Sequence, residues 1–145
     1  MKRRKELVPL SREHNRALLL ARSGRRAART DDPRQIKRVW EHLDSVYRGE
    51  MRAHFATEEK LILPLLRDLG EQALTERLQR EHRAIARNIE SPALWTRDRL
   101  SSLADVLYQH VRLEERKVFP LVQHHADPDL LAALARHPDT HDPPQ

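Results

Sequence analysis

The strongest constraint on the fold is a sequence pattern that the chain contains twice, 56 residues apart. The two copies begin at His54 and His110, and both read His-x-x-x-Glu-Glu-x-x-x-x-Pro-Leu. A second pattern, Arg-Glu-His, also occurs twice, at residues 12–14 and 80–82. Each half of the chain is therefore predicted to be a helical hairpin, with one histidine on its first helix and a His-x-x-x-Glu pair on its second.

The rest of the sequence also favours helices, because it has only three glycines and is rich in Leu, Ala, Arg and Glu. Apolar residues recur at helical spacing in four long segments and one short one. The expected helices run from Ser11 to about Arg29, from Pro33 through Leu61 with a kink or stop at Pro64, from Leu74 to Ile89, from Leu100 to Val118, and from Pro128 to about Arg136. The expected capping residues are Ser11, Asp32, Gly70 and Asp127.

Short connections between long amphipathic helices predict an all-α fold, an antiparallel up-down-up-down four-helix bundle with a short C-terminal helix. We expect this bundle to occupy residues 1–137 and the tail, residues 138–145, to be disordered.

Six polar residues lie on the apolar stripes of these helices and are the candidate site. A spacing of four residues places a histidine and a glutamate on one helix face, so that both can reach the same ion. Buried carboxylates and imidazoles cost on the order of several kcal/mol for each uncompensated charge, and bound metal offsets that cost. The candidate metal ligands are His14, His54, Glu58, His82, His110 and Glu114. Such nitrogen and oxygen donors suit Fe, Mn, Zn or Co.

These six residues in this order, with the Glu-Glu and Pro-Leu elements, resemble the hemerythrin-like (HHE cation-binding) family over about residues 10 to 125. The resemblance implies a non-haem di-iron centre in a four-helix bundle, with an oxo or hydroxo bridge between the irons. Glu58 and Glu114 would also bridge them, and the four histidines would be terminal ligands. Zn or Mn could substitute for iron.

The sequence departs from the oxygen-carrying hemerythrins that it resembles. Those carriers have a fifth histidine on the third helix, where this chain has Leu78 and Ala86, and an Asp five residues after the last histidine, where it has Glu114 at four. Each iron would then keep one open position, which argues against reversible oxygen storage. Glu50 or Tyr47, within two turns of His54, could instead fill or hydrogen-bond to such a position.

The other five histidines are expected at the surface or its boundary. His42 lies twelve residues before His54, which rotates it by about 120° from the ligand stripe. The remaining four follow the last long helix; they are His124, His125, His137 and His141.

Three functions remain open at this point. The first is a di-iron protein that binds or reacts with O2, NO or peroxide in an oxygen or redox-stress response, and also binds small anions such as azide. The second is an enzyme, a weak di-iron peroxidase or oxidase. The third is a metal-free helical module that binds an acidic partner through the arginine stripe formed by Arg22, Arg25, Arg26 and Arg29.

The composition and the N-terminal residues limit which kinds of site, which partners and which cellular location we expect. The absence of cysteine excludes thiolate metal sites and a cysteine nucleophile. No aromatic residue is interleaved with the arginine stripe, so nucleic acid is not an expected partner. We expect no membrane association and a cytoplasmic location, because the chain has no long apolar segment and its basic N-terminal residues do not lead into one.

Overall fold

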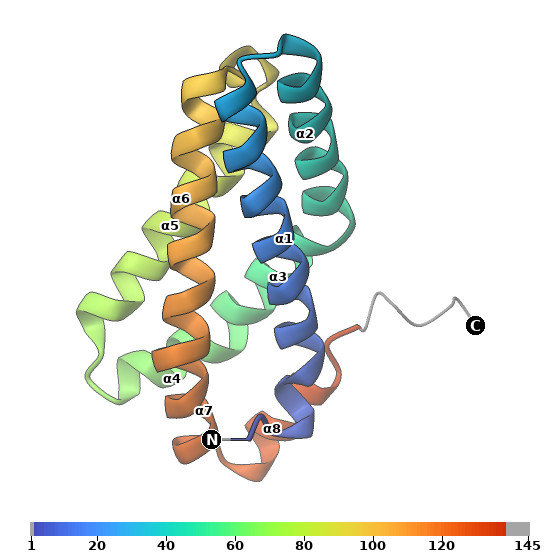
Figure 1. The fold of residues 1–145 in the computed structure, drawn as a ribbon. Coiled ribbons are helices and arrows are strands. Elements are labelled where there is room, and N and C mark those ends of the chain that lie inside the picture. Colours follow the sequence, from blue (N-terminus) through green and yellow to red (C-terminus); the bar gives the residue numbers. More distant parts are fainter. Residues whose placement is uncertain (1, 139–145) are drawn as a thin grey trace.

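The computed structural model describes residues 2–138, and within that range its regular structure is entirely helical (Figure 1). The predicted all-α class is confirmed. The long helices are α1 (Val8–Thr30), α2 (Pro33–Val46), α5 (Gln72–Glu90) and α6 (Arg97–Leu113). Shorter α-helices are α3 (Arg52–Thr57), α4 (Leu63–Asp68), α7 (Phe119–His125) and α8 (Pro128–Ala135). The remaining turns are the 3-10 helices η1 (Lys5–Leu7) and η4 (Pro92–Leu94) and the π-helices η2 (Tyr47–Met51), η3 (Glu58–Ile62) and η5 (Glu114–Val118).

The long helices pack side by side as a bundle. Helix α1 lies along α6, α2 contacts α1, α5 and α6, and α5 contacts α6 (Figure 1). Helix α8 closes the end of the bundle where the chain begins, because it packs against η1 and η3. Helix α8 and the N-terminal η1 therefore lie at the same end of the bundle.

Three of the four expected caps are confirmed. Asp32 accepts a hydrogen bond from the backbone of Arg34 at 2.9 Å, and Asp127 does so from Leu130 at 2.8 Å. Gly70 follows α4 with a φ of 80°, a conformation that glycine adopts without strain. The expectation for Ser11 is wrong. Helix α1 begins earlier, with a proline in its first turn, and the Ser11 hydroxyl instead donates to the Glu115 carboxylate at 2.8 Å.

Both copies of the repeated motif contain a π-helical turn, at η3 and η5. Each turn begins at the motif's first glutamate and is followed directly by a short α-helix with a proline in its first turn, Pro64 or Pro120. Proline lacks an N–H group and clashes with the preceding helical turn, and a wider turn relieves both problems. The helical path continues past Pro64 into α4, and the change of direction that Figure 1 shows lies earlier, between α2 and α3.

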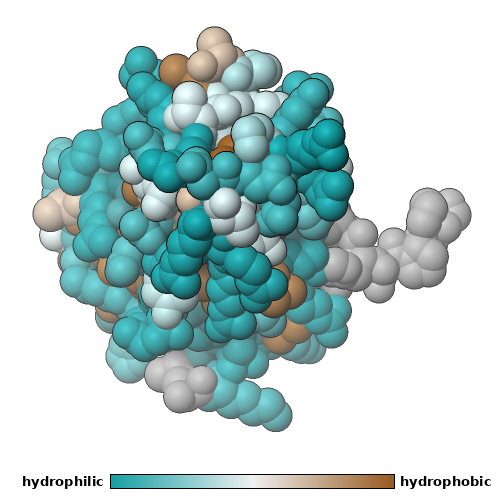
Figure 2. All heavy atoms as spheres, turned by 45° about the horizontal axis from the view of Figure 1, so that its top comes forward, coloured by the Kyte–Doolittle hydropathy of each residue, from teal (hydrophilic) through white to brown (hydrophobic). Residues whose placement is uncertain are grey.

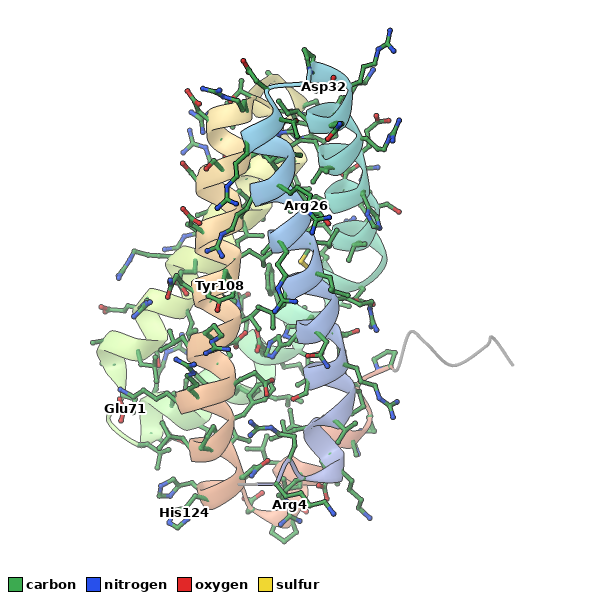
Figure 3. The ribbon with its side chains drawn as sticks, viewed as in Figure 1. Arg4, Arg26, Asp32, Glu71, Tyr108 and His124 are labelled. Atoms are coloured by element: carbon green, nitrogen blue, oxygen red, sulfur yellow. The ribbon has the colours of Figure 1, made fainter. Side chains whose placement is uncertain are left out.

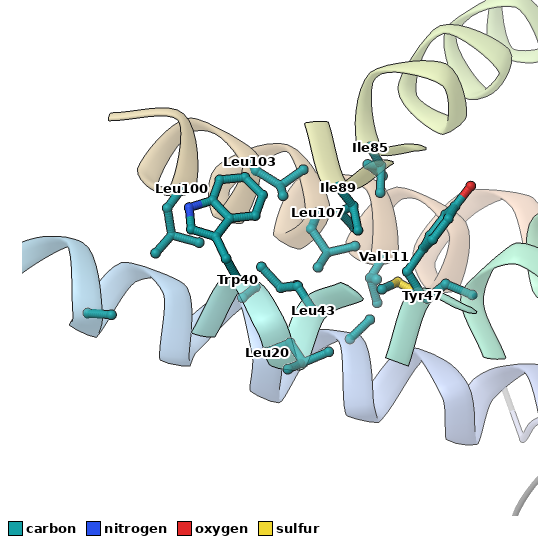
Figure 4. Close-up of a cluster of buried hydrophobic side chains, with 14 of the residues drawn as sticks. Leu20, Trp40, Leu43, Tyr47, Ile85, Ile89, Leu100, Leu103, Leu107 and Val111 are labelled. Carbon is teal, nitrogen blue, oxygen red and sulfur yellow. The ribbon is translucent and has the colours of Figure 1, made fainter. Parts of the chain in front are cut away.

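Two apolar clusters fill the bundle. One lies toward the α1–α2 connection and includes Trp40, Leu43, Ile85 and Leu107 (Figure 4). The other lies near α8 and includes Leu10, Ile62, Leu66, Leu78, Val118 and Leu134. Along every long helical segment, the candidate ligands fall between residues of one cluster and residues of the other, as His82 does between Leu78 and Ile85. A polar layer therefore separates two apolar cores.

The face shown in Figure 2 is mostly hydrophilic, with small and scattered hydrophobic patches. Among the described residues, none of the helices combines the length and the apolar character that crossing a membrane requires.

Candidate metal centre

The six predicted ligands converge in the polar layer between the two apolar clusters. His14 comes from α1, His82 from α5, and the two His-x-x-x-Glu pairs from the α3–η3 and α6–η5 junctions. Each of these six residues is at most 3% exposed. A layer of donors this deeply buried has little access to water, so its charges must be compensated from within.

The donor atoms form two groups that share both glutamates. The first group contains His14, His54, Glu58 and Glu114, and the second contains Glu58, Glu114, His82 and His110. Within each group, one donor atom from every residue lies within 4.8 Å of all the others. The arrangement offers two adjacent metal positions with two shared carboxylates.

The distances inside the groups fit coordination to a metal ion. Two donors bound about 2.1 Å from one ion at right angles lie about 3.0 Å apart. The Nε2 atoms of His14 and His54 are 3.1 Å apart, and the Nε2 atom of His82 is 3.1 Å from a Glu58 oxygen. The Nε2 atoms of His14 and His110 lie 3.1 Å and 2.9 Å from the same oxygen of Glu114.

Several of these atoms are buried without a hydrogen bond, which is a second indication that this layer suits metal ions. They include one oxygen of Glu58, one oxygen of Glu114 and the Nε2 atom of His110. The His110 nitrogen forms no hydrogen bond even though a Glu114 oxygen lies 2.9 Å away. Metal ions at the two positions would satisfy these atoms, so the residues present fit a dinuclear centre.

A second layer of carboxylates orients the histidine rings. The other ring nitrogen, Nδ1, faces a carboxylate oxygen in all four histidines. The pairs are His14–Glu115 at 2.6 Å, His54–Glu13 at 2.9 Å, His82–Glu59 at 3.1 Å and His110–Glu81 at 2.8 Å. A neutral imidazole that donates from Nδ1 has its lone pair on Nε2, which here points into the centre. The network therefore assigns the tautomer that can bind metal.

The spacing of apolar residues did not single out these four outer carboxylates, although the repeats contain them. Glu13 and Glu81 belong to the two Arg-Glu-His segments, and Glu59 and Glu115 are the second glutamates of the two long motifs. Equivalent glutamates contact equivalent histidines in the two halves. Their identical positions in the two repeats were the available signal.

The shared glutamates also change the proton affinity of the histidines. Burial alone would lower the pKa of His110, but Glu114, Glu81 and Glu58 together raise it to about 10. The pKa of His14 is raised and that of His54 is raised well above its ordinary value, in each case by neighbouring glutamates acting against burial. Burial would raise the pKa of Glu114, but the adjacent imidazoles hold it well below its ordinary value. Without metal, protonated imidazoles thus compensate the buried carboxylates.

The two alternative ligands have other partners. The Tyr47 hydroxyl donates to a Glu90 oxygen at 2.7 Å. The Arg16 Nε donates to both oxygens of Glu50, at 2.8 and 2.7 Å. Neither residue belongs to the two donor groups.

The expectations for the remaining histidines are partly confirmed. His42, His124 and His125 are exposed, as expected. The expectation for His137 is wrong, because this residue is buried and its Nε2 lies 2.8 Å from Glu13. The packing of α8 against the bundle places His137 beside Glu13, and the spacing of residues along one helix could not predict this packing. His141 and most of the predicted tail lie in residues 139–145, outside the described part of the chain.

The arginine stripe lies on the outside of α1. Arg22, Arg26 and Arg29 are exposed. Arg25 is half-buried, pairs with Asp105 at 2.9 Å and lies over the Tyr108 ring of the neighbouring α6. Figure 3 shows Arg26 and Tyr108 on these two adjacent helices.

With the fold and the donor groups established, the comparison with protein families is decisive. The family model of the hemerythrin HHE cation-binding domain matches residues 9–122. The chain belongs to this family. The matched range contains all six candidate ligands and ends before α8. Searches of curated proteins and of solved structures found no match.

The charges of this HHE centre predict opposite pH trends for the metal-free and metal-loaded forms. The raised pKa of His110 stabilises the metal-free fold fully below about pH 6.5, and this contribution is lost as the pH rises toward 10. Metal binding requires neutral imidazoles and therefore weakens as the pH falls. We expect the difference in melting temperature between loaded and metal-free protein to grow from pH 6 to pH 10. Thermal melts of both forms across this range test it, and a difference that shrinks would contradict it.

Proposed function

We propose that this HHE domain holds two iron ions and binds or reacts with O2, NO or peroxide. His14 and His54 would hold one ion, His82 and His110 the other, and Glu58 and Glu114 would be shared. The observation that carries the proposal is the pair of donor groups with both carboxylates in common. Zn or Mn could occupy the same donors, since imidazole and carboxylate bind several divalent metals.

When bound, two iron ions supply exchangeable electrons and coordination positions for a small ligand. The chain's own residues prepare that chemistry. The outer carboxylates fix the histidine tautomers, and the two apolar clusters exclude water on both sides of the polar layer. Aromatic rings add to this screen: Phe55 stacks on His82 at 4.1 Å and Phe119 on His14 at 5.0 Å between centroids.

A cavity of about 270 Å³ supports access of a small ligand to one half of the centre. It is lined in part by Phe55, Glu59, His82 and Ala86. Ala86 is one of the two positions at which the oxygen carriers that the sequence resembles place a fifth histidine, and its small side chain leaves room next to His82. The equivalent space at Leu78 is closed, because that side chain is fully buried in the second apolar cluster.

The cavity also has a charge preference. The basic residues Arg52 and Arg83 contribute to its wall, with Glu59 as the acidic one. Positive side chains at the mouth of a cavity raise the local concentration of anions. Small anions such as azide are therefore included among the proposed ligands.

The proposal also covers organisation and location. The four long helical segments would run up-down-up-down, residues 1–137 would form one unit, and the protein would act in the cytoplasm. A metal-free interaction module is the less favoured function, because it leaves buried atoms of Glu58, Glu114 and His110 without partners. Weak peroxidase or oxidase activity is compatible with the same centre.

The function is tested by mixing the reduced, iron-loaded protein with oxygenated buffer in a stopped-flow spectrometer. Glu50 and Tyr47 have other partners and lie outside the donor groups, so bound iron would keep a position for a small ligand, which would favour oxidation of the centre over release of O2. We expect oxidation in air and at least slow consumption of hydrogen peroxide. A spectral change that persists in air and reverses on degassing would instead show reversible oxygen binding.

The access cavity is tested by Ala86→Leu, which fills it. We expect azide to bind the oxidised iron protein about tenfold more slowly, equivalent to about 1.4 kcal/mol of added barrier, with unchanged iron content. Ala84→Leu is the matched control, because this alanine is on the same helix but exposed and away from the cavity. Equal azide rates in wild type and Ala86→Leu would show that the ligand uses another route.

A further inference from the structure

The C-terminal end of the described chain reaches the metal centre through one buried side chain. His137 follows α8, and its side chain is 1% exposed. Its Nε2 atom lies 2.8 Å from Glu13 Oε1, and its Nδ1 atom lies 2.8 Å from the Thr57 hydroxyl. A neutral ring with its proton on Nε2 satisfies both contacts, donating to Glu13 and accepting from Thr57.

The packing of α8 determines where His137 lies. Leu134, one turn earlier, is fully buried in the second apolar cluster. The backbone N–H of His137 donates to the Leu134 carbonyl at 3.0 Å, which continues the helical path beyond α8. The imidazole is therefore held by a docked helix.

Glu13 differs from the other three outer carboxylates in its surroundings. Its side chain is 3% exposed, whereas those of Glu81, Glu115 and Glu59 are 17%, 29% and 48% exposed. One oxygen of Glu13 contacts both His54 Nδ1 and His137 Nε2, and its other oxygen is buried without a hydrogen bond. By contrast Glu81, its counterpart in the repeat, accepts from the half-exposed Arg77 at 3.1 Å.

These contacts break the symmetry of the two halves. A carboxylate near the surface can exchange a lost partner for water, but a buried one cannot. Glu13 thus depends on its two imidazole partners, and the orientation of His54 depends on Glu13. The repeat contains no counterpart of His137, because this residue lies outside both copies and beyond the matched family range.

We infer that His137 is a positioning residue of the metal centre, which holds Glu13 and through it orients His54 toward the ion bound by His14 and His54. This inference rests on the proposed function. The half of the centre that contains His14 and His54 then requires the docked C-terminal segment, whereas the half that contains His82 and His110 does not. The two ions are bound unequally, although the ligands themselves are duplicated.

The experiment compares His137→Ala, His137→Gln and wild type as full-length chains, titrated with Co²⁺ under anaerobic conditions. Loss of an outer hydrogen-bond partner of a metal-binding histidine costs about 10–100-fold in affinity. Because His137 acts one contact further out, through Glu13, we expect His137→Ala to weaken one of the two binding steps by up to this factor and to alter the Co²⁺ absorption of that step alone. His137→Gln should recover part of the loss, because its amide can donate to Glu13.

Matched variants separate positioning from general destabilisation. His125→Ala removes an exposed histidine and should leave both steps unchanged. Glu13→Gln should weaken the same step as His137→Ala, and Glu81→Gln should weaken the other step. The melting temperature of each metal-free variant shows whether the chain still folds.

The outcomes distinguish the inference from the proposed function. If both Co²⁺-binding steps of His137→Ala have the affinities of wild type, or if both weaken equally, the positioning role is overturned. The dinuclear centre would still stand in either case. A third ion in wild type that His137→Ala loses would also overturn it, since Glu13, His54 and His137 would then be ligands. No Co²⁺ binding by wild type would overturn the proposed function itself.

Discussion

Compensation of buried charge is the constraint on which this fold depends. Two carboxylates and four imidazoles lie between two apolar clusters, where an unpaired charge costs on the order of several kcal/mol. The chain meets that cost in two ways. Glutamates raise the pKa values of His14, His54 and His110, so protons on these imidazoles balance negative charge when metal is absent, and the donor geometry fits metal ions that would replace those protons. The outer carboxylates take part in both states, because they hold the histidine rings in one orientation.

Duplication explains much of the centre, and the departures from it explain how its halves differ. Both copies of the long motif have a π-helical turn at their glutamates, and equivalent glutamates contact equivalent histidines. The His14–His54 side is nevertheless closed by α8 and His137. The His82–His110 side instead adjoins a cavity next to Ala86. On our proposal, one half would hold its ion firmly, while the other would be accessible to a small ligand.

The sequence alone predicted the helical class, the caps at Asp32, Gly70 and Asp127, and the convergence of the six candidate donors. These features follow from local rules of spacing and capping. The burial of His137 could not be predicted, because it depends on how α8 docks. The start of α1 was misplaced because Ser11, a good capping residue, instead has a long-range partner in Glu115. The outer carboxylates were present in the repeats, but a glutamate next to a ligand gives no sign of the direction in which it points.

The central claim is that two metal ions occupy the two donor groups and share Glu58 and Glu114. Anomalous diffraction from crystals of the iron-loaded protein, measured on both sides of the iron absorption edge, tests it most directly. The account predicts two adjacent iron peaks, one beside His14 and His54 and the other beside His82 and His110, with both glutamates between them. A single peak, or iron found only at surface histidines such as His124 and His125, would contradict it.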